Sequence, residues 1–213
     1  MPQPNRHMPF FHVLDAARQP GCVLCRLIST RTRRYIESVL YESVNDTGFR
    51  DRWRAARGFC HRHSWILAEF NDALGTAILY EDVVNHYGKR LLTEGTGRGC
   101  PLCKGEVVDL DDCIAVIEQS WDDDELRGAI EAGDGVCGPH LRALRNKARR
   151  ADVRESFLKV SVARLKELAV ELRQQIDGFD YQHTPPTDER IKCAWRRAIE
   201  LLVGWRDISE ALA

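Results

Sequence analysis

The chain carries one cysteine motif twice, first as Gly21-Cys22-Val23-Leu24-Cys25-Arg26 and, 78 residues later, as Gly99-Cys100-Pro101-Leu102-Cys103-Lys104. A second motif also recurs. It reads Gly58-Phe59-Cys60-His61-Arg62-His63 and, 77 residues later, Gly135-Val136-Cys137-Gly138-Pro139-His140. The nearly equal offsets indicate one sequence repeat of about 77 residues that is used twice, and not a solenoid of many short units.

Apolar residues in both repeats recur at helical spacing. In the second repeat the stripe steps by three or four residues through Val107, Leu110, Ile114, Ile117 and Trp121. After the second Cys-x-x-His motif the same spacing continues through Leu158, Val162, Leu165, Ala169, Leu172 and Ile176. In the first repeat we expect a helix over about 22–44, a second that ends near Gly58, and a third after Cys-x-x-His. Each repeat is therefore predicted to be a three-helix element, and the fold class is all-α, because no stretch alternates in the manner of a strand.

Two stretches rich in turn residues, 93–99 and 177–188, are predicted linkers. They divide the chain into an N-terminal segment (1–20), a first metal-binding helical repeat (21–98), a second metal-binding helical repeat (99–176), and a linker with a C-terminal helix (177–213). The apolar stripe of that last helix contains Trp195 and Trp205. Two tryptophans on one stripe predict that the helix docks onto the repeats.

The spacing of the cysteines and histidines predicts two metal sites. Two ligands separated by two residues can bind one ion, because a tight turn or a first helical turn brings their side chains together. Two such pairs complete a tetrahedron. The order of the chain suggests one Cys₃His site from Cys22, Cys25, Cys60 and His63, and another from Cys100, Cys103, Cys137 and His140. Since both repeats yield the same Cys₃His set, metal binding is favoured over two chance clusters.

The repeat also selects one histidine over another. His61 is closer to Cys60 in sequence, but its counterpart is Gly138, whereas His63 corresponds to His140. We therefore expect His63 to be the ligand. Closed sets of four thiolate and imidazole ligands are typical of structural zinc, so two Zn²⁺ ions are predicted. An iron–sulfur cluster is the alternative, and thiol–disulfide exchange at the Cys-x-x-Cys pairs is a third reading.

Composition narrows the class of protein. The 213 residues contain 31 Lys and Arg against 32 Asp and Glu, for a formal charge of −1, which argues against nucleic acid or an anionic membrane as the main partner. No apolar run approaches the ~20 residues of a membrane span, and the start lacks the pattern of a signal peptide. A cytoplasmic location is expected, where eight cysteines point to metal ligands more than to disulfides.

Other clusters are better explained by structure than by function. Two basic stretches, which include Arg142–Arg154 and Arg50–Arg57, are expected to be solvated helix faces. Asp122-Asp123-Asp124-Glu125 marks the start of a helix, and the polar group of Glu81, Asp82, Asn85 and His86 is expected at the surface. Cys113 and Cys193 are expected to be ordinary packed thiols.

The series of motifs, together with Phe179-Asp180-Tyr181 and Trp195-Arg196-Arg197-Ala198-Ile199-Glu200, resembles an uncharacterised family of bacterial and archaeal proteins that is known only as a domain of unknown function. The resemblance spans nearly the whole chain and supports the same eight ligands. It implies a prokaryotic cytoplasmic setting and supplies no activity.

Three functions are compatible with these patterns. The favoured one is a non-enzymatic interaction or regulatory module with a protein partner, held together by two zinc sites. The second is an iron–sulfur redox or sensor protein, and the third is an enzyme with a pocket between the repeats. An enzyme would need an open coordination position or a pocket with perturbed carboxylates.

Overall fold

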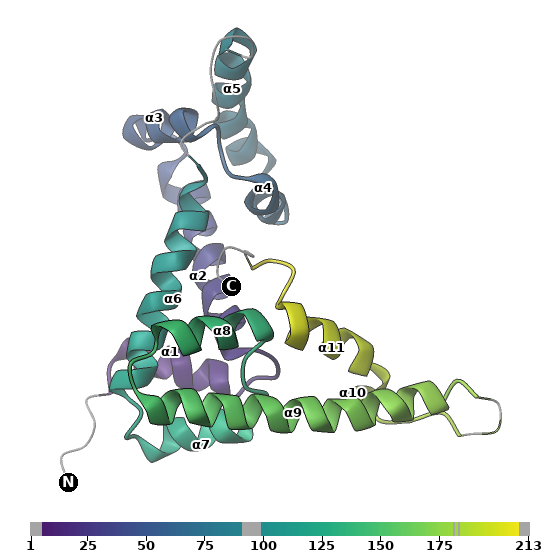
Figure 1. The fold of residues 1–213 in the computed structure, drawn as a ribbon. Helices are drawn as coiled ribbons and strands as arrows, with labels where there is room; N and C mark the ends of the chain where they lie inside the picture. The colour runs from purple at the N-terminus through teal and green to yellow at the C-terminus, as the bar shows by residue number, and fades with distance from the viewer. Residues whose placement is uncertain (1–5, 91–98, 181, 183, 209–213) are drawn as a thin grey trace. The chain divides into compact units, whose positions relative to one another are not determined.

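The computed structural model describes residues 6–90, 99–180, 182 and 184–208 (Figure 1). Every regular element in this part of the chain is a helix, which confirms the all-α class. Most of the linker expected at 93–99 lies outside the described residues. Within the described ranges, no helix combines the length and the apolar character that crossing a membrane requires.

The elements follow in the order α1 (Met8–Ala17), α2 (Val23–Ser38), the π-helical turn η1 (Val39–Ser43), α3 (Thr47–Ala56), α4 (His61–Ala68), α5 (Ala73–Arg90), α6 (Pro101–Gln119), α7 (Asp124–Ala132), α8 (Gly138–Lys147), α9 (Ala151–Asp177), α10 (Glu189–Lys192) and α11 (Ala194–Val203). The single helix expected after each Cys-x-x-His motif is in fact a pair, α4 with α5 or α8 with α9. In the first pair the break includes Asn71, whose φ of 55° lies in the left-handed region that asparagine tolerates better than most residues.

Aspartates start the two short helices α3 and α7. The Asp46 side chain accepts a hydrogen bond from the Phe49 amide at 2.5 Å. The Asp123 side chain accepts from the amides of Glu125 and Leu126 at 3.0 and 3.1 Å. Each carboxylate thus satisfies free N–H groups of the first helical turn, which explains why α3 and α7 begin at these two points.

The described helices form two compact units. The terminal unit comprises Met1–Ile28 and Leu110–Ala213, and the central unit comprises Ser29–Asp109. Both divisions fall inside long helices, α2 and α6. The units therefore do not coincide with the segments 21–98 and 99–176, which simply follow the order of the chain.

The terminal unit is built around α9, which packs against α7, α8, α10 and α11, while α1 packs against α7. In Figure 1, α9 is the long helix with α8 and α11 beside it. The core contains Phe10 and Leu14 of α1, Ile114 of α6, Leu144 of α8 and Phe157 of α9, all at most 2% exposed. Helix α1, which our sequence analysis left as an unassigned segment, is therefore part of this core.

The sequence pattern correctly predicts α9 as a helix, but it does not identify the buried face. The residues Leu158, Val162 and Leu165 are 40–44% exposed, whereas Phe157 and Leu168 on a neighbouring face are buried. Trp195 of α11 is likewise 51% exposed, so the docking predicted for this ring is wrong. Trp205 does pack against the terminal core, as predicted.

Trp53 is the central residue of the core of the central unit. Its ring is 2% exposed and lies edge-on to Phe59, with ring centroids 4.7 Å apart, and edge-on to Tyr80 at 5.6 Å. Its indole N–H donates a hydrogen bond to the Leu79 carbonyl at 2.8 Å. The ring thereby ties α3 to α5 and to the segment that enters α4.

We predict that Trp53→Ala lowers the free energy of unfolding by about 3–5 kcal/mol, the usual cost of removing a buried aromatic side chain. Urea denaturation measures the effect. Trp65→Ala is the matched control, because this ring is 64% exposed and its removal should cost less than about 1 kcal/mol. Equal losses for the two variants would contradict the assignment of this core.

Candidate metal centres

The structure gathers all eight predicted residues into two clusters. Centre 1 lies in the terminal unit and consists of Cys22, Cys25, Cys137 and His140. Centre 2 lies in the central unit and consists of Cys60, His63, Cys100 and Cys103. Within each cluster the four candidate ligand atoms all lie within 4.8 Å of one another.

The pairing that the order of the chain suggested is wrong. Centre 1 combines the first Cys-x-x-Cys motif with the second Cys-x-x-His motif. Centre 2 combines the first Cys-x-x-His motif with the second Cys-x-x-Cys motif. In the expected pairing, the helix that follows α2 would have to be as long as α2, because the chain must return to the Cys-x-x-Cys motif at the start of α2. Helix α2 has 16 residues and spans about 24 Å, whereas α3, which follows it, has 10 and spans about 15 Å. The 19 residues of α6 and the 9 of α7 show the same mismatch.

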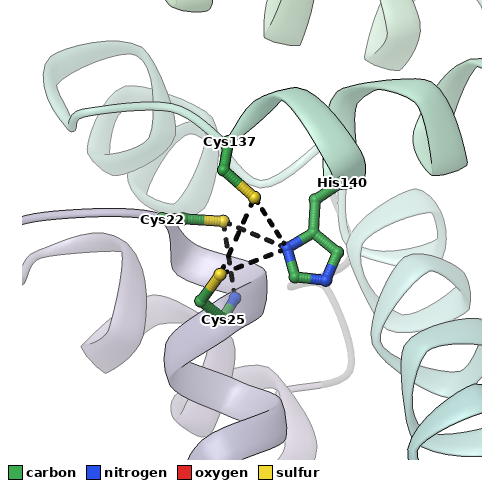
Figure 2. Close-up of side chains that lie close together, drawn as sticks. All are labelled: Cys22, Cys25, Cys137 and His140. Atoms are coloured by element: carbon green, nitrogen blue, oxygen red, sulfur yellow. Dashed lines mark hydrogen bonds between the residues drawn. The ribbon is translucent and has the colours of Figure 1, made fainter. Parts of the chain in front are cut away.

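Centre 1 converges on one nitrogen of its histidine (Figure 2). The Nδ1 atom of His140 lies 3.3 Å from the Cys22 sulfur, 3.4 Å from that of Cys25 and 3.2 Å from that of Cys137. The sulfur atoms of Cys25 and Cys137 are 3.7 Å apart. All four residues are buried, so this centre is closed to solvent.

Centre 2 repeats this geometry with greater exposure. The Nδ1 atom of His63 lies 3.3 Å from the sulfur atoms of Cys60 and Cys100 and 3.6 Å from that of Cys103. The Cys60 and Cys103 sulfur atoms are 3.6 Å apart. His63 and Cys100 are buried, but Cys60 and Cys103 are only partly buried.

The same local structure positions every ligand pair. The first cysteine directly precedes a helix, as Cys60 and Cys137 do at the N-caps of α4 and α8. The second ligand lies three residues later, in the first helical turn, and so faces the same side. A glycine with positive φ comes one or two residues before each pair, at Gly21, Gly58, Gly99 and Gly135.

The ligands of centre 2 change one another's pKa values. Burial lowers the pKa of His63, but hydrogen bonds with Cys100 and Glu106 outweigh it and raise this pKa to about 9. Burial raises the pKa of Cys100, but the bond with His63 outweighs it and lowers this pKa to about 6. Burial, with the neighbouring Cys100 charge, raises the pKa of Cys103 to about 12. A divalent ion that binds here must displace protons from the imidazole and from thiols.

Centre 1 shows the same pattern. Burial lowers the pKa of His140, but hydrogen bonds with Cys137 and Cys22 outweigh it and raise this pKa to about 10. Burial raises the pKa of Cys22, but bonds with Cys137, Cys25 and His140 bring it below its usual value. In each centre, contact with the cysteines thus favours the protonated imidazole, and contact with the histidine favours the thiolate form of one cysteine.

The second nitrogen of the histidine has different surroundings in the two centres. The Nε2 atom of His63 lies 3.1 Å from a carboxylate oxygen of Glu106. The Nε2 atom of His140 is buried and has no hydrogen-bond partner among the described residues. Our sequence analysis missed Glu106, although its position three residues after Cys103 places it on the ligand-bearing face of α6.

Residues that the motifs left out lie elsewhere. His61 packs its ring near Trp65, at 6.3 Å between centroids, and is not in either cluster. Cys113 is buried in the terminal core, as expected, whereas Cys193 is exposed, so the packing predicted for it is wrong. We expected Asp82 to belong to a polar group at the protein surface. Its carboxylate accepts hydrogen bonds from Arg50 and so pairs with the basic stretch Arg50–Arg57.

The comparisons with known proteins agree with the resemblance noted from the motifs. Residues 6–97 match the "Family of unknown function (DUF6062)". The chain is also similar to an "Uncharacterized 23.9 kDa protein in xynA 3'region" of Caldicellulosiruptor sp. (strain Rt8B.4), with 25% identity over 203 residues, which cover 90% of this chain and 99% of the relative. No solved structure matches the chain. The resemblance to an uncharacterised family is therefore confirmed, and it brings no activity with it.

Paired substitutions test which motifs share a centre. Because Cys25 and Cys137 belong to one cluster, the variant C25S/C137S should lose one metal equivalent and keep the other. The variant C25S/C60S removes a thiolate from each cluster and should lose both. Metal content of the folded proteins by native mass spectrometry gives the count. One ion retained by C25S/C60S and none by C25S/C137S would restore the pairing by chain order.

Proposed function

We propose that each centre binds one Zn²⁺ ion and that the two ions have a structural role in a non-enzymatic interaction module. The observation that carries the proposal is the convergence of three sulfur atoms and one imidazole nitrogen in each unit. Three thiolates and a neutral imidazole around Zn²⁺ would have a net charge of −1. Binding requires the deprotonated form of each ligand, so it would release protons.

The separations between ligand atoms support a single ion. A tetrahedral zinc with bonds of about 2.3 Å to sulfur and about 2.0–2.1 Å to nitrogen sets sulfur atoms about 3.8 Å apart and sulfur about 3.5 Å from nitrogen. The sulfur atoms of Cys25 and Cys137 lie 3.7 Å apart, and those of Cys60 and Cys103 lie 3.6 Å apart. In an iron–sulfur cluster the four ligands are divided among two or more irons, so ligands on different irons would lie further apart than these.

The number of ligands supports a structural role. Catalytic zinc sites keep a position open for water or substrate, whereas structural sites have four protein ligands. Each centre supplies four. In centre 1 the ion would join Cys25 to Cys137, 112 residues further along the chain, and so fix the start of α2 to the start of α8.

We predict that the purified protein is colourless and contains two zinc ions per chain. Complete removal of zinc by a chelator should lower the melting temperature by about 6–20 °C. The reason is that structural zinc contributes up to roughly 10–16 kcal/mol in isolated fingers, and even about 3–5 kcal/mol here corresponds to such a shift at about 2–4 °C per kcal/mol. Elemental analysis and calorimetry measure both quantities.

Two results would contradict this prediction. An unchanged melting temperature after full removal of zinc would show that the ions are dispensable for folding. Brown protein that contains several irons in place of zinc would instead establish the iron–sulfur alternative.

Exposed apolar stripes support a protein as the partner. On α9, Leu158, Val162 and Leu165 follow one another at helical spacing and are 40–44% exposed. Helix α11 presents Trp195 and Ile199 in the same way, at 51% and 53% exposure. Contiguous apolar residues on a surface are characteristic of interaction sites. The near-neutral net charge also fits a module that does not bind nucleic acid, and eight cysteines fit metal ligands in a cytoplasmic setting better than a disulfide framework.

The stripe on α9 provides the test of this role. Affinity purification from a cell lysate without crosslinking, followed by quantitative mass spectrometry, should recover a protein with the wild-type chain that V162K/L165K fails to recover. Lys159→Ala and Lys166→Ala, which change exposed polar positions of the same helix, should retain it. All variants must contain two zinc ions. Identical recovery by the stripe variant and by the controls would argue against the α9 surface as the interaction site.

A further inference from the structure

The two centres differ in what lies behind the histidine. In both, Nδ1 faces the three sulfur atoms, so Nε2 points away from the place where an ion would bind. At His63 this Nε2 atom meets the Glu106 carboxylate at 3.1 Å, and both side chains are at most 1% exposed. At His140 it is buried with no hydrogen-bond partner in the described part of the chain.

Two further residues hold the Glu106 carboxylate in place. Arg62, which precedes His63 on α4, lies 3.0 Å from Oε1 and 2.6 Å from Oε2. The hydroxyl of Thr32 on α2 donates a hydrogen bond to Oε1 at 3.2 Å. Because both carboxylate oxygens have partners, the side chain is fixed in orientation and its buried charge is paired.

The sequence shows that this network belongs to one centre only. The offset that relates Cys22 to Cys100 and Cys25 to Cys103 also relates Ile28 to Glu106. The offset that relates His63 to His140 relates Arg62 to Pro139. At these positions the terminal unit has an apolar residue and a proline, and Ile28 is fully buried in its core.

We propose that Glu106 is the positioning residue of centre 2. Its carboxylate accepts the Nε2–H of His63, which fixes the tautomer whose Nδ1 lone pair is available to the metal, and Arg62 and Thr32 hold the carboxylate for this task. The inference rests on the proposed function, in that both centres bind a metal ion. Such outer partners of a ligating histidine typically contribute about 10–100-fold to metal affinity.

The difference in solvent access between the two centres explains why the Glu106 network is found at centre 2. All four ligands of centre 1 are buried. In centre 2 the side chains of Cys60 and Cys103 are only partly buried, so solvent reaches this centre more easily. Burial of the ligands retains the metal in centre 1, and the hydrogen bonds of the Glu106 network retain it in centre 2.

Titration of zinc-loaded protein with a chromophoric chelator tests the proposal. In Glu106→Ala one of the two zinc ions should be lost at about 10–100-fold lower chelator strength, while the other is unaffected. Glu106→Gln keeps an acceptor for the N–H and should restore much of the affinity. The matched control is Glu69→Gln, which changes a paired, half-exposed glutamate of the same unit that lies outside both clusters.

Nitrogen-15 NMR of the histidine rings adds a readout that a purely structural role would not move. The Nε2–H signal of His63 should shift in Glu106→Ala, and that of His140 should stay unchanged. Equal weakening of both zinc ions, or unchanged affinity with an unchanged His63 signal, would overturn the role of Glu106. Wild-type protein that retains no zinc would instead overturn the proposed function, and the inference with it.

Discussion

Three sulfur atoms and one imidazole nitrogen meet at tetrahedral separations in each unit, and the path of the chain depends on these meetings. Three sulfur atoms and an imidazole nitrogen this close together form a set of ligands that could hold a metal ion. In centre 1 the ligands Cys22 and His140 are 118 residues apart in the sequence. The start of the chain is therefore held against α8 and shares a core with α7 and α9.

The two centres reach a similar geometry by different physical means. Centre 1 relies on burial and leaves the Nε2 atom of His140 without a partner in the described residues, which costs roughly 1–3 kcal/mol. Centre 2 is more open, and it places a paired carboxylate behind His63. Similar motifs thus lead to centres that differ in their exposure to solvent and in the hydrogen bonding of the histidine.

The ligands could be predicted from sequence because their spacing is local: three residues in a first helical turn fix the relation between Cys22 and Cys25. Their partners could not, because pairing depends on how far α2 and α3 extend, and the sequence pattern does not give lengths accurately enough. The buried face of α9 was missed for a related reason. Periodicity identifies an apolar stripe such as that of Leu158, but Phe157 and its neighbours form a second stripe, and only packing decides which one is buried.

Cadmium-113 NMR tests the crossed ligand sets most directly, since each metal nucleus couples only to the β-protons of the cysteines that bind it. In protein loaded with this isotope we expect two resonances. One should correlate with Cys22, Cys25 and Cys137, and the other with Cys60, Cys100 and Cys103. A resonance that correlates with both Cys25 and Cys60 would contradict the account.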